Sequence, residues 1–387
     1  MAADVGSDEA ARYATIEKVG EGAFGSVFRA RDRVTGAEVA LKRVRVPDAR
    51  AFPANTLREL NALRRLGDAT PFVVPLLGSH THGSNLVLVM PFLPCSLATV
   101  LSGRDAPLPE EDAACLGRML LCGVSAIHAE GLLHRDLKPA NLLLTASGVL
   151  LIADLGQART QLGPHDDGAG GGVAASGAGA AASGGAAASG GAAAAADLSH
   201  AVATRWYRAP ELLFGSRSYG VGVDIWAVGC ILAQLSTLSP LLPGESDIDQ
   251  LVRVLEFLGS PTKESWPGVE ELPDYGKIEL PSDLKPIPLR SLMPHASDEA
   301  VTLCEGMLRY NDTLRTQPVE ALRSGWILKA RRQPATTAEL LPQMRVNAGA
   351  AVEEAAVAAG GEGGAAARRR QRAGLKPVRF PQEVVVE

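Results

Sequence analysis

One short stretch constrains the fold and the chemistry of this chain more than any other. It is His134–Asn141, read as H-R-D-L-K-P-A-N, and a further carboxylate, Asp154, follows after a short predicted hairpin. Asp136 can orient a hydroxyl and accept its proton, while Lys138 supplies a cation beside it. Asn141 and Asp154 offer the oxygen ligands that Mg²⁺ prefers. This combination at this spacing is what phosphoryl transfer requires.

A glycine-rich segment nearer the N-terminus, residues 20–27, reads G-x-G-x-x-G-x-V and supports the same chemistry. Glycines at this spacing also begin dinucleotide-binding units, but in those proteins a helix follows the glycines directly. Here a second strand-like segment follows, with Val39–Lys42 downstream, so we predict a hairpin whose backbone amides cover phosphates. We expect Lys42 to contact the α- and β-phosphates and to pair with Glu59, on the one helix of this region, rather than with Glu38. The residues of the predicted phosphate-covering loop are Gly20, Glu21, Gly22, Ala23, Phe24, Gly25, Ser26 and Val27.

The periodicity of apolar residues predicts an α+β fold with two unequal lobes. Residues 13–93 read as a small antiparallel sheet carrying one main helix, and residues 94–330 as a larger, mostly helical lobe. On the helix of the small lobe, Leu57, Leu60, Leu63 and Leu66 are expected to share one buried face. Strands are predicted at 14–19, 26–30, 38–46, 72–77 and 86–92, and helices at 55–66, from Pro109 to Gly131, and at 224–238, 247–258 and 298–308.

Three segments have compositions that do not predict a packed structure. Residues 1–12 are acidic, and residues 164–196 consist almost wholly of Gly, Ala and Ser. Such a segment buries too little apolar surface to offset the entropy lost on ordering. Residues 331–387 are predicted to form a low-complexity tail, with a basic cluster at 368–372.

Charge, hydropathy and cysteine content exclude several classes of partner. The formal net charge is −5, which argues against general attraction to nucleic acid or acidic lipid. No uncharged apolar run is long enough to span a membrane. The 5 cysteines are scattered without a C-x-x-C pair, as is usual for proteins of a reducing compartment. We therefore predict a cytoplasmic protein that binds neither nucleic acid nor membranes.

The motifs together identify a family. The segment after Asp154 ends in Ala203–Glu211, A-T-R-W-Y-R-A-P-E, and with the motifs above it resembles the cyclin-dependent-kinase branch of the eukaryotic protein kinases over about residues 13–327. Within that branch, the stretches 52–60 and Glu271–Ile278 (E-L-P-D-Y-G-K-I) resemble the cell-cycle-related kinase, or cyclin-dependent kinase 20, family. The resemblance implies the bilobal protein kinase fold, Ser/Thr protein kinase activity, and ATP with Mg²⁺ as cofactors.

The resemblance also assigns roles in activation. Ser199 matches the family's activating phosphorylation site, and Arg58, Arg135 and Arg159 match the arginines that bind that phosphate. A phosphate would neutralise a cluster of guanidinium groups that otherwise repel one another. Thr204 is expected to brace the catalytic Asp and Lys.

Further roles concern the nucleotide pocket and the core. Glu211 and Arg315 match a buried ion pair of the large lobe, and Leu155 stands where the family usually has Phe. Ser96 replaces a ribose-binding Asp, and the inhibitory Thr-Tyr pair of the glycine loop is replaced by residues without hydroxyls. The adenine pocket is expected to be walled by Val19, Val27, Ala40, Met90, Phe92, Leu93 and Leu143, with Met90 at the gatekeeper position.

The biological role implied by the resemblance is a step in a regulatory cascade. Family members act on related kinases of a ciliary cascade and in control of cilium or flagellum length or the cell cycle, so a protein substrate is expected, with the cilium, flagellum or nucleus as further locations. Whether a cyclin or another activating subunit is required, and whether Arg208 directs the kinase to proline-containing sites, stays open. The alternative is a pseudokinase scaffold, favoured only by Leu155 and by Pro91 in the connection between the lobes.

Overall fold

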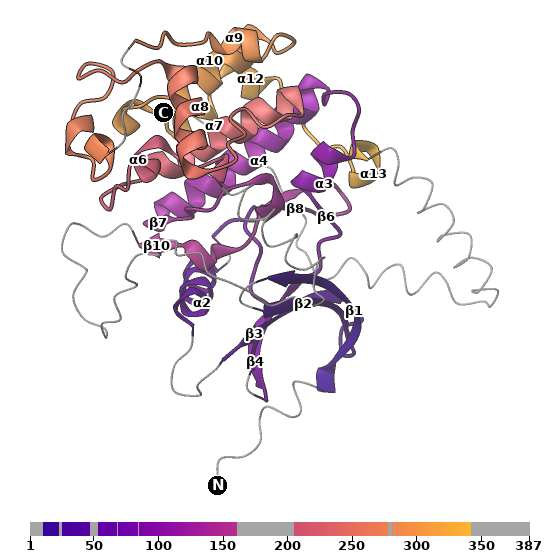
Figure 1. Cartoon of the computed structure of the whole chain (residues 1–387). Coiled ribbons are helices and arrows are strands. Elements are labelled where there is room, and N and C mark those ends of the chain that lie inside the picture. The colour runs from indigo at the N-terminus through magenta and orange to yellow at the C-terminus, as the bar shows by residue number, and fades with distance from the viewer. Residues whose placement is uncertain are drawn as a thin grey trace, which may run out of the picture.

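The small N-terminal lobe, the lower part of the molecule in Figure 1, is built on an antiparallel sheet. The sheet has five strands in the order β1-β2-β3-β5-β4. The computed structural model describes residues 11–22, 25–46, 53–67, 69–83, 85–160, 205–277, 281 and 283–341. The insert at 164–196, the start of the chain and the stretch 342–387 lie outside these residues. The strands are β1 (Tyr13–Gly22), β2 (Gly25–Asp32), β3 (Glu38–Arg45), β4 (Gly78–His82) and β5 (Asn85–Pro91).

The centre of this sheet fixes the position of Lys42. On β3 it is paired with Val27 of β2 on one side and with Leu88 of β5 on the other. Residues that face each other across strands lie on the same side of a sheet. Leu88 belongs to the small apolar cluster that also contains Leu60 of the helix α2 (Ala54–Leu66). Lys42 therefore lies on the face of the sheet that α2 covers.

Two details of this lobe differ from the sequence prediction. The predicted strand 72–77 is wrong as a member of this sheet, since Val73 instead bridges Ile152 of the helical lobe, and the edge strand is the polar β4. Leu57 was expected on the buried face of α2 but is 40% exposed. The buried face is rotated so that Glu59 is included in it. The first difference arises because the apolar residues at 72–74 pack into the core of the helical lobe.

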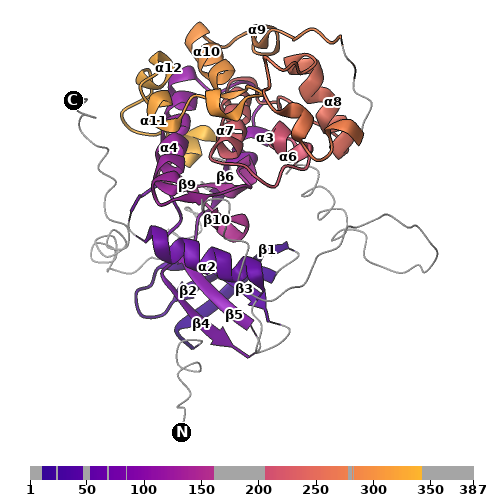
Figure 2. The same ribbon diagram turned by 90° about the vertical axis from the view of Figure 1, so that its left-hand side faces the viewer.

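The C-terminal lobe is mostly helical, as predicted, and its centre is α7 (Gly222–Thr237), which is buried on nearly all sides (Figure 2). Pro109 precedes α4, and three acidic residues in the first turn of α4 stabilise the helix by interacting with the positive end of its dipole. The other helices are α3 (Leu97–Ser102), α4 (Glu110–Ala129), α6 (Pro210–Leu213), α8 (Asp247–Leu258), α9 (Leu289–Leu292), α10 (Asp298–Met307), α11 (Pro318–Ala321), α12 (Gly325–Leu328) and α13 (Thr337–Leu340).

Short strands and single-turn helices lie where the two lobes meet. The hairpin of β8 and β9 pairs with β6, which continues from the connection after β5, and β7 pairs with β10. The loop between β7 and η1 carries Asp136 and Lys138. Their bounds are β6 (Cys95–Ser96), β7 (Leu132–Leu133), β8 (Leu142–Leu144), β9 (Leu150–Ile152) and β10 (Arg159–Thr160), and the 3-10 helices are η1 (Pro139–Asn141), η2 (Leu155–Gln157), η3 (Val269–Glu271), η4 (Tyr275–Lys277) and η5 (Asp312–Leu314).

The helical lobe continues past the predicted boundary at residue 330. Residues 331–341, assigned from composition to the tail, run back over the lobe and end in α13, whose Leu340 and Leu341 are buried. Thr336 and Glu339 form a capping box, a local signal for a helix start that the composition of the whole tail conceals. None of the helices in the described ranges is both long and apolar enough to cross a membrane.

Candidate active site

The predicted catalytic loop lies between β7 and β8, and its functional side chains contact one another. Lys138 Nζ lies 3.0 Å from Asp136 Oδ2, so the cation is held beside the carboxylate. Asn141 Nδ2 donates to the backbone oxygen of Asp136 at 2.8 Å and to its Oδ2 at 3.0 Å. The loop thus presents a carboxylate, an ammonium group and an amide oxygen from one rigid turn.

A carboxylate that the sequence did not reveal as functional anchors this loop. Asp224, in the first turn of α7, accepts hydrogen bonds from the backbone N–H of His134 at 2.8 Å and of Arg135 at 2.7 Å. His128 Nε2 lies 2.9 Å from the same carboxylate. Burial alone would raise the pKa of Asp224, but the bonds to His128 and to the Arg135 amide hold its pKa below the ordinary value. A buried carboxylate with two backbone hydrogen bonds therefore fixes the backbone just before Asp136.

The second predicted metal ligand is tied to the same loop. His134 is fully buried, and its Nε2 lies 3.0 Å from the backbone oxygen of Ala153. Ala153 in turn donates its N–H to the backbone oxygen of Asn141 at 2.8 Å. Arg135 and Asp154 both have left-handed backbone conformations, with φ of 68° and 62°. Such conformations are unfavourable for residues other than glycine, so the surrounding contacts must impose them.

A network of three charged side chains joins the small lobe to the segment that follows β9. Lys42 Nζ lies 2.7 Å from Glu59 Oε1 and 2.8 Å from Oε2, and it also reaches Asp154 Oδ1 at 3.0 Å. The expected pairing of Lys42 with Glu59 therefore exists in this structure. Glu38 bonds instead to Arg29 on the outer part of the sheet. The network therefore holds β3, α2 and the segment after β9 next to one another.

Burial and charge act in opposite directions on these three groups. Burial raises the pKa of Glu59, and the nearby charge of Lys42 offsets that effect only in part. Burial also acts to raise the pKa of Asp154, but attraction to Lys42 brings it below the ordinary value. Burial acts to lower the pKa of Lys42, and the two carboxylates more than compensate. Asp154 is therefore the group most firmly held as an anion, as a metal ligand must be.

The two predicted metal ligands have chemistry that fits Mg²⁺. The Asn141 amide nitrogen points to Asp136, which leaves its oxygen as the available ligand atom. Asp154 uses Oδ1 for Lys42. Mg²⁺ commonly binds through one or two such protein oxygens, with water and nucleotide phosphates completing its shell. When bound, the ion would neutralise phosphate charge, and the residues of this site that would hold it are Asn141 and Asp154.

The residues expected to wall the nucleotide pocket lie on the strands β1, β2, β3, β5 and β8 and in the connection after β5. Gly25 lies so close to β3 that a Cβ there would be 2.0 Å from the Arg43 oxygen, which explains the need for glycine. Ala40 pairs with Met90 across β3 and β5, and Leu143 lies on β8 of the other lobe. The guanidinium of Arg29 stacks over the ring of Phe92 in the connection. Val19 is half-exposed, Leu93 is partly buried, and Ala23 and Phe24 lie outside the described residues.

Ser96 has a structural partner in this structure. Its hydroxyl oxygen accepts the Thr99 N–H at 3.1 Å and caps α3. Leu155, which stands in the position usually held by Phe, is fully buried in the main apolar core. A leucine therefore fills that position without leaving the metal-binding segment unsupported.

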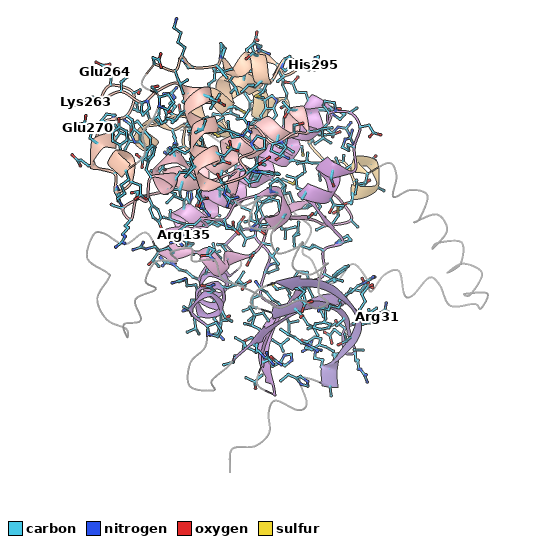
Figure 3. The ribbon with its side chains drawn as sticks, in the orientation of Figure 1. Arg31, Arg135, Lys263, Glu264, Glu270 and His295 are labelled. Atoms are coloured by element: carbon cyan, nitrogen blue, oxygen red, sulfur yellow. The ribbon has the colours of Figure 1, made fainter. Side chains whose placement is uncertain are left out.

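Two of the three expected phosphate-binding arginines meet at one tyrosine. Arg135 donates to Tyr219 Oη at 2.7 Å, and the guanidinium groups of Arg135 and Arg159 lie 5.7 and 6.0 Å from its ring centre. Figure 3 shows Arg135 at the level where the lobes meet. Arg58 bonds to Asn55 on its own helix. Ser199 and Thr204, the expected phosphorylation site and brace, lie outside the described residues.

The predicted ion pair of the large lobe is present and fully enclosed. Arg315 binds both carboxylate oxygens of Glu211, at 2.7 and 2.8 Å. Its remaining donors bond to the backbone oxygens of Arg309, Gly222 and Tyr310. Every side of this guanidinium is used by the protein itself. The pair therefore stabilises the fold rather than serving a ligand.

Sequence reasoning missed the residues that support the loop from behind. Asp224 was visible only as the first residue of a predicted apolar helix. His128 and Tyr219 belong to none of the motifs that were read from the sequence. The available signal was Asp224 itself, because a carboxylate at the start of a helix buried on all sides needs buried partners.

Comparisons with known proteins agree with this geometry. The protein kinase domain family matches residues 13–327. Cyclin-dependent kinase 20 of Rattus norvegicus is 41% identical over 336 residues, which cover 86% of this chain and 87% of that protein. The Homo sapiens protein of the same name is 40% identical with the same coverage, and cyclin-dependent kinase 7 of Xenopus laevis is 35% identical over 348 residues, 89% of this chain and 88% of that protein. The chain therefore belongs to the protein kinase family, in its cyclin-dependent-kinase branch.

Proposed function

We propose that this chain is an ATP- and Mg²⁺-dependent Ser/Thr protein kinase. The observation that carries the proposal is the assembled network in which Lys42 binds Glu59 and Asp154 together, directly above a formed catalytic loop. Asp136 orients the substrate hydroxyl and takes its proton, and Lys138 offsets charge on the transferred phosphoryl group. A scaffold without activity would not need both side-chain clusters, Lys42 with its two carboxylates and Asp136 with Lys138, so the pseudokinase alternative is not favoured.

The experiment is phosphate transfer from Mg²⁺-ATP to a protein substrate by purified wild type and by Asp136→Asn. Loss of the base is expected to lower kcat by about 10²- to 10⁴-fold. Asp105→Asn, an exposed carboxyl outside the site, is the matched control and keeps the wild-type rate. Equal rates for wild type and Asp136→Asn would refute the enzymatic function.

We also propose that phosphorylation of Ser199 activates the enzyme. Arg135 and Arg159, already gathered at Tyr219, and Arg58 on α2 would bind the phosphate and so connect the helix of the small lobe to the catalytic loop. Phosphatase treatment is expected to lower the rate of wild type but not that of Ser199→Ala. Ser189→Ala, from the same segment, should still respond to phosphatase. An unchanged rate of wild type after dephosphorylation would refute the switch.

The resemblance to cyclin-dependent kinase 20 further supports a protein substrate that is itself a kinase, in a cascade of the cilium, the flagellum or the cell cycle. We place the protein in the cytoplasm, with these structures or the nucleus as sites of action. Comparing phosphosites in cells carrying wild type and Asp136→Asn tests this. Co-purification of a cyclin-like subunit with the wild-type protein would support binding of a cyclin, as the name of its relatives suggests.

A further inference from the structure

The segment 331–341, which we call the C-terminal brace, contacts three separate parts of the helical lobe. At its start, Arg331 lies 2.8 Å from Glu111 Oε1 and 2.9 Å from Asp112 Oδ1, both in the first turn of α4. Arg118, two turns further along α4, donates to the backbone oxygen of Arg331 at 2.6 Å. This end of the brace is thus fixed to the longest helix of the lobe.

The far end of the brace is fixed to α3. Arg104 donates to the backbone oxygen of Leu340 at 2.7 Å. Leu341 packs so closely on Gly103 that a Cβ at that glycine would lie 2.8 Å from Leu341 Cδ2. Leu340 and Leu341 are both buried, so α13 is held by apolar packing as well as by the hydrogen bond.

The middle of the brace lies on the turn between β8 and β9. Thr337 Oγ1 donates to the backbone oxygen of Thr145 at 2.6 Å, and the Thr337 N–H donates to the oxygen of Ala146 at 3.2 Å. Gly148 has a φ of 79°, and a Cβ there would lie only 1.7 Å from the backbone oxygen of Ala335. The turn and the brace therefore fit each other through backbone contacts that leave no room for a side chain.

This turn joins the two residues that would hold Mg²⁺. Asn141 directly precedes β8, and Asp154 follows β9 after one residue. Each of these strands has three residues, so the register of a short hairpin sets the separation between the two ligands. Burial fixes the middle of the hairpin, but the turn, from Thr145 to Val149, has exposed residues and takes its outer contacts from the brace.

We propose that the C-terminal brace is a positioning element for metal binding, and that Thr337 is its positioning residue. By holding the turn, the brace fixes the register and tilt of β8 and β9, and hence the spacing of Asn141 and Asp154. Metal affinity depends steeply on ligand spacing and on the groups that orient the ligands. The inference rests on the proposed Mg²⁺-ATP-dependent activity, to which it adds a determinant outside the region matched by the kinase family.

The test uses the full chain with Thr337→Val, which keeps the shape of the side chain and removes the hydrogen bond to Thr145. The dissociation constant of ATP is measured by calorimetry with and without Mg²⁺, and the Mg²⁺ concentration for half-maximal phosphate transfer is measured separately. We expect Thr337→Val to weaken the Mg²⁺-dependent part of ATP binding by about tenfold, in the range seen for groups that orient metal ligands. ATP binding without Mg²⁺ and kcat at saturating Mg²⁺ stay as in wild type.

Arg331→Gln is the matched control, because it removes the ion pairs of the brace with Glu111 and Asp112 of α4 without touching the turn. It is expected to lower the melting temperature without changing the Mg²⁺ dependence.

Gly148→Ala is a second variant, since its methyl group would push the turn away from Ala335, and it should weaken Mg²⁺-dependent binding at least as much as Thr337→Val. Wild-type Mg²⁺ dependence in both turn variants would overturn the proposal, as would an equal change in Arg331→Gln. Because nucleotide binding is read directly, absence of phosphate transfer in wild type would count against the proposed function alone.

Discussion

Two cation–carboxylate pairs in this protein, one inside the helical lobe and one between the lobes, differ in what surrounds the cation. Arg315 in the helical lobe is fully buried, and its bonds go to Glu211 and to backbone oxygens that cannot move independently. The side chain of Lys42, between the lobes, is 22% exposed, and the bonds of its ammonium group go to the carboxylates of Glu59 and Asp154. The first pair has no capacity for another ligand. The second can exchange a carboxylate contact for a phosphate oxygen.

The difference shows how similar chemistry is divided between folding and catalysis. Removing one member of a buried ion pair is costly, because the charge of the other member then has neither a partner nor water around it. A pair at an opening between lobes is held by side chains that can rotate, and water reaches it. Substitutions should therefore affect stability at Arg315 and activity around Lys42.

The largest expected effect is on stability, from Arg315→Met. Removing the guanidinium leaves the Glu211 carboxylate buried without its cationic partner, so the free energy of unfolding should fall by about 3–5 kcal/mol. Urea unfolding measures this. Arg309→Met, on an exposed neighbour, should leave the value almost unchanged. If Arg315→Met kept its stability but lost kcat per folded molecule, the division between the two pairs would be wrong.

Glu59→Gln should show the opposite behaviour. Neutralising Glu59 weakens its charge-assisted bond to Lys42 by about 1.5–3 kcal/mol, and kcat/KM should fall by roughly ten- to hundredfold. Stability should hardly change, because burial already makes the charged form of Glu59 costly and raises its pKa. Glu38→Gln, which alters the partly exposed pair with Arg29, is the control for both steady-state kinetics and urea unfolding. A large loss of stability in Glu59→Gln would place this pair with Arg315.

The pH dependence of stability sharpens the same comparison. Because the folded-state pKa of Glu59 is raised above the ordinary 4.5, the folded protein holds this proton more tightly than the unfolded chain. The resulting stability is present below pH 4.5 and is lost as the pH rises through the folded pKa, by at most about 1.4 kcal/mol per pH unit. Urea unfolding across this range should show the slope in wild type relative to Glu59→Gln. Parallel curves for the two proteins would contradict the raised pKa.

The smallest expected effect lies at Ser96, where the framework of the pocket meets the nucleotide site. Ser96→Ala removes the cap of α3 and should cost about 1 kcal/mol of stability, with the KM for ATP unchanged. Ser96→Asp keeps a capping oxygen and introduces the carboxylate that the family resemblance assigns to ribose binding, so we expect its KM for ATP to fall. Thermal unfolding and ATP titrations measure the two effects. A raised KM in Ser96→Ala would show that the hydroxyl serves the nucleotide.

Much of the fold could be predicted because local patterns and tertiary packing agree. The helix predicted at 247–258 is α8, since its apolar spacing and the Ser246 cap specify the same start. The wrong strand at 72–77 shows the opposite case. Its apolar residues serve the helical lobe through Val73 and Ile152, whereas the true edge strand, β4, is a polar stretch without alternation. A sequence pattern shows that residues are buried but not against which lobe.

The site was predictable where its chemistry is concentrated in one motif, and not where support comes from afar. Asp136, Lys138 and Asn141 lie within a few residues of one another, so their spacing is informative. Asp224 lies 89 residues after Arg135, to whose backbone it bonds, and no pattern joins the two. The brace was hidden for a similar reason. Its capping box is short, and the composition of the rest of the tail dominates any window that contains it.

The backbone at Arg135 and Asp154 has a consequence for attempts to engineer this enzyme. Each residue is held in a left-handed conformation, which costs about 1–2 kcal/mol for a side chain of ordinary type and nothing for glycine. A screen that rewards heat resistance alone would therefore favour glycine at both positions. It would enrich a more durable protein without its guanidinium at Tyr219 and without the carboxylate beside Lys42. Directed evolution of this protein therefore needs selection for turnover at every round, because two of its functional residues have unfavourable backbone conformations.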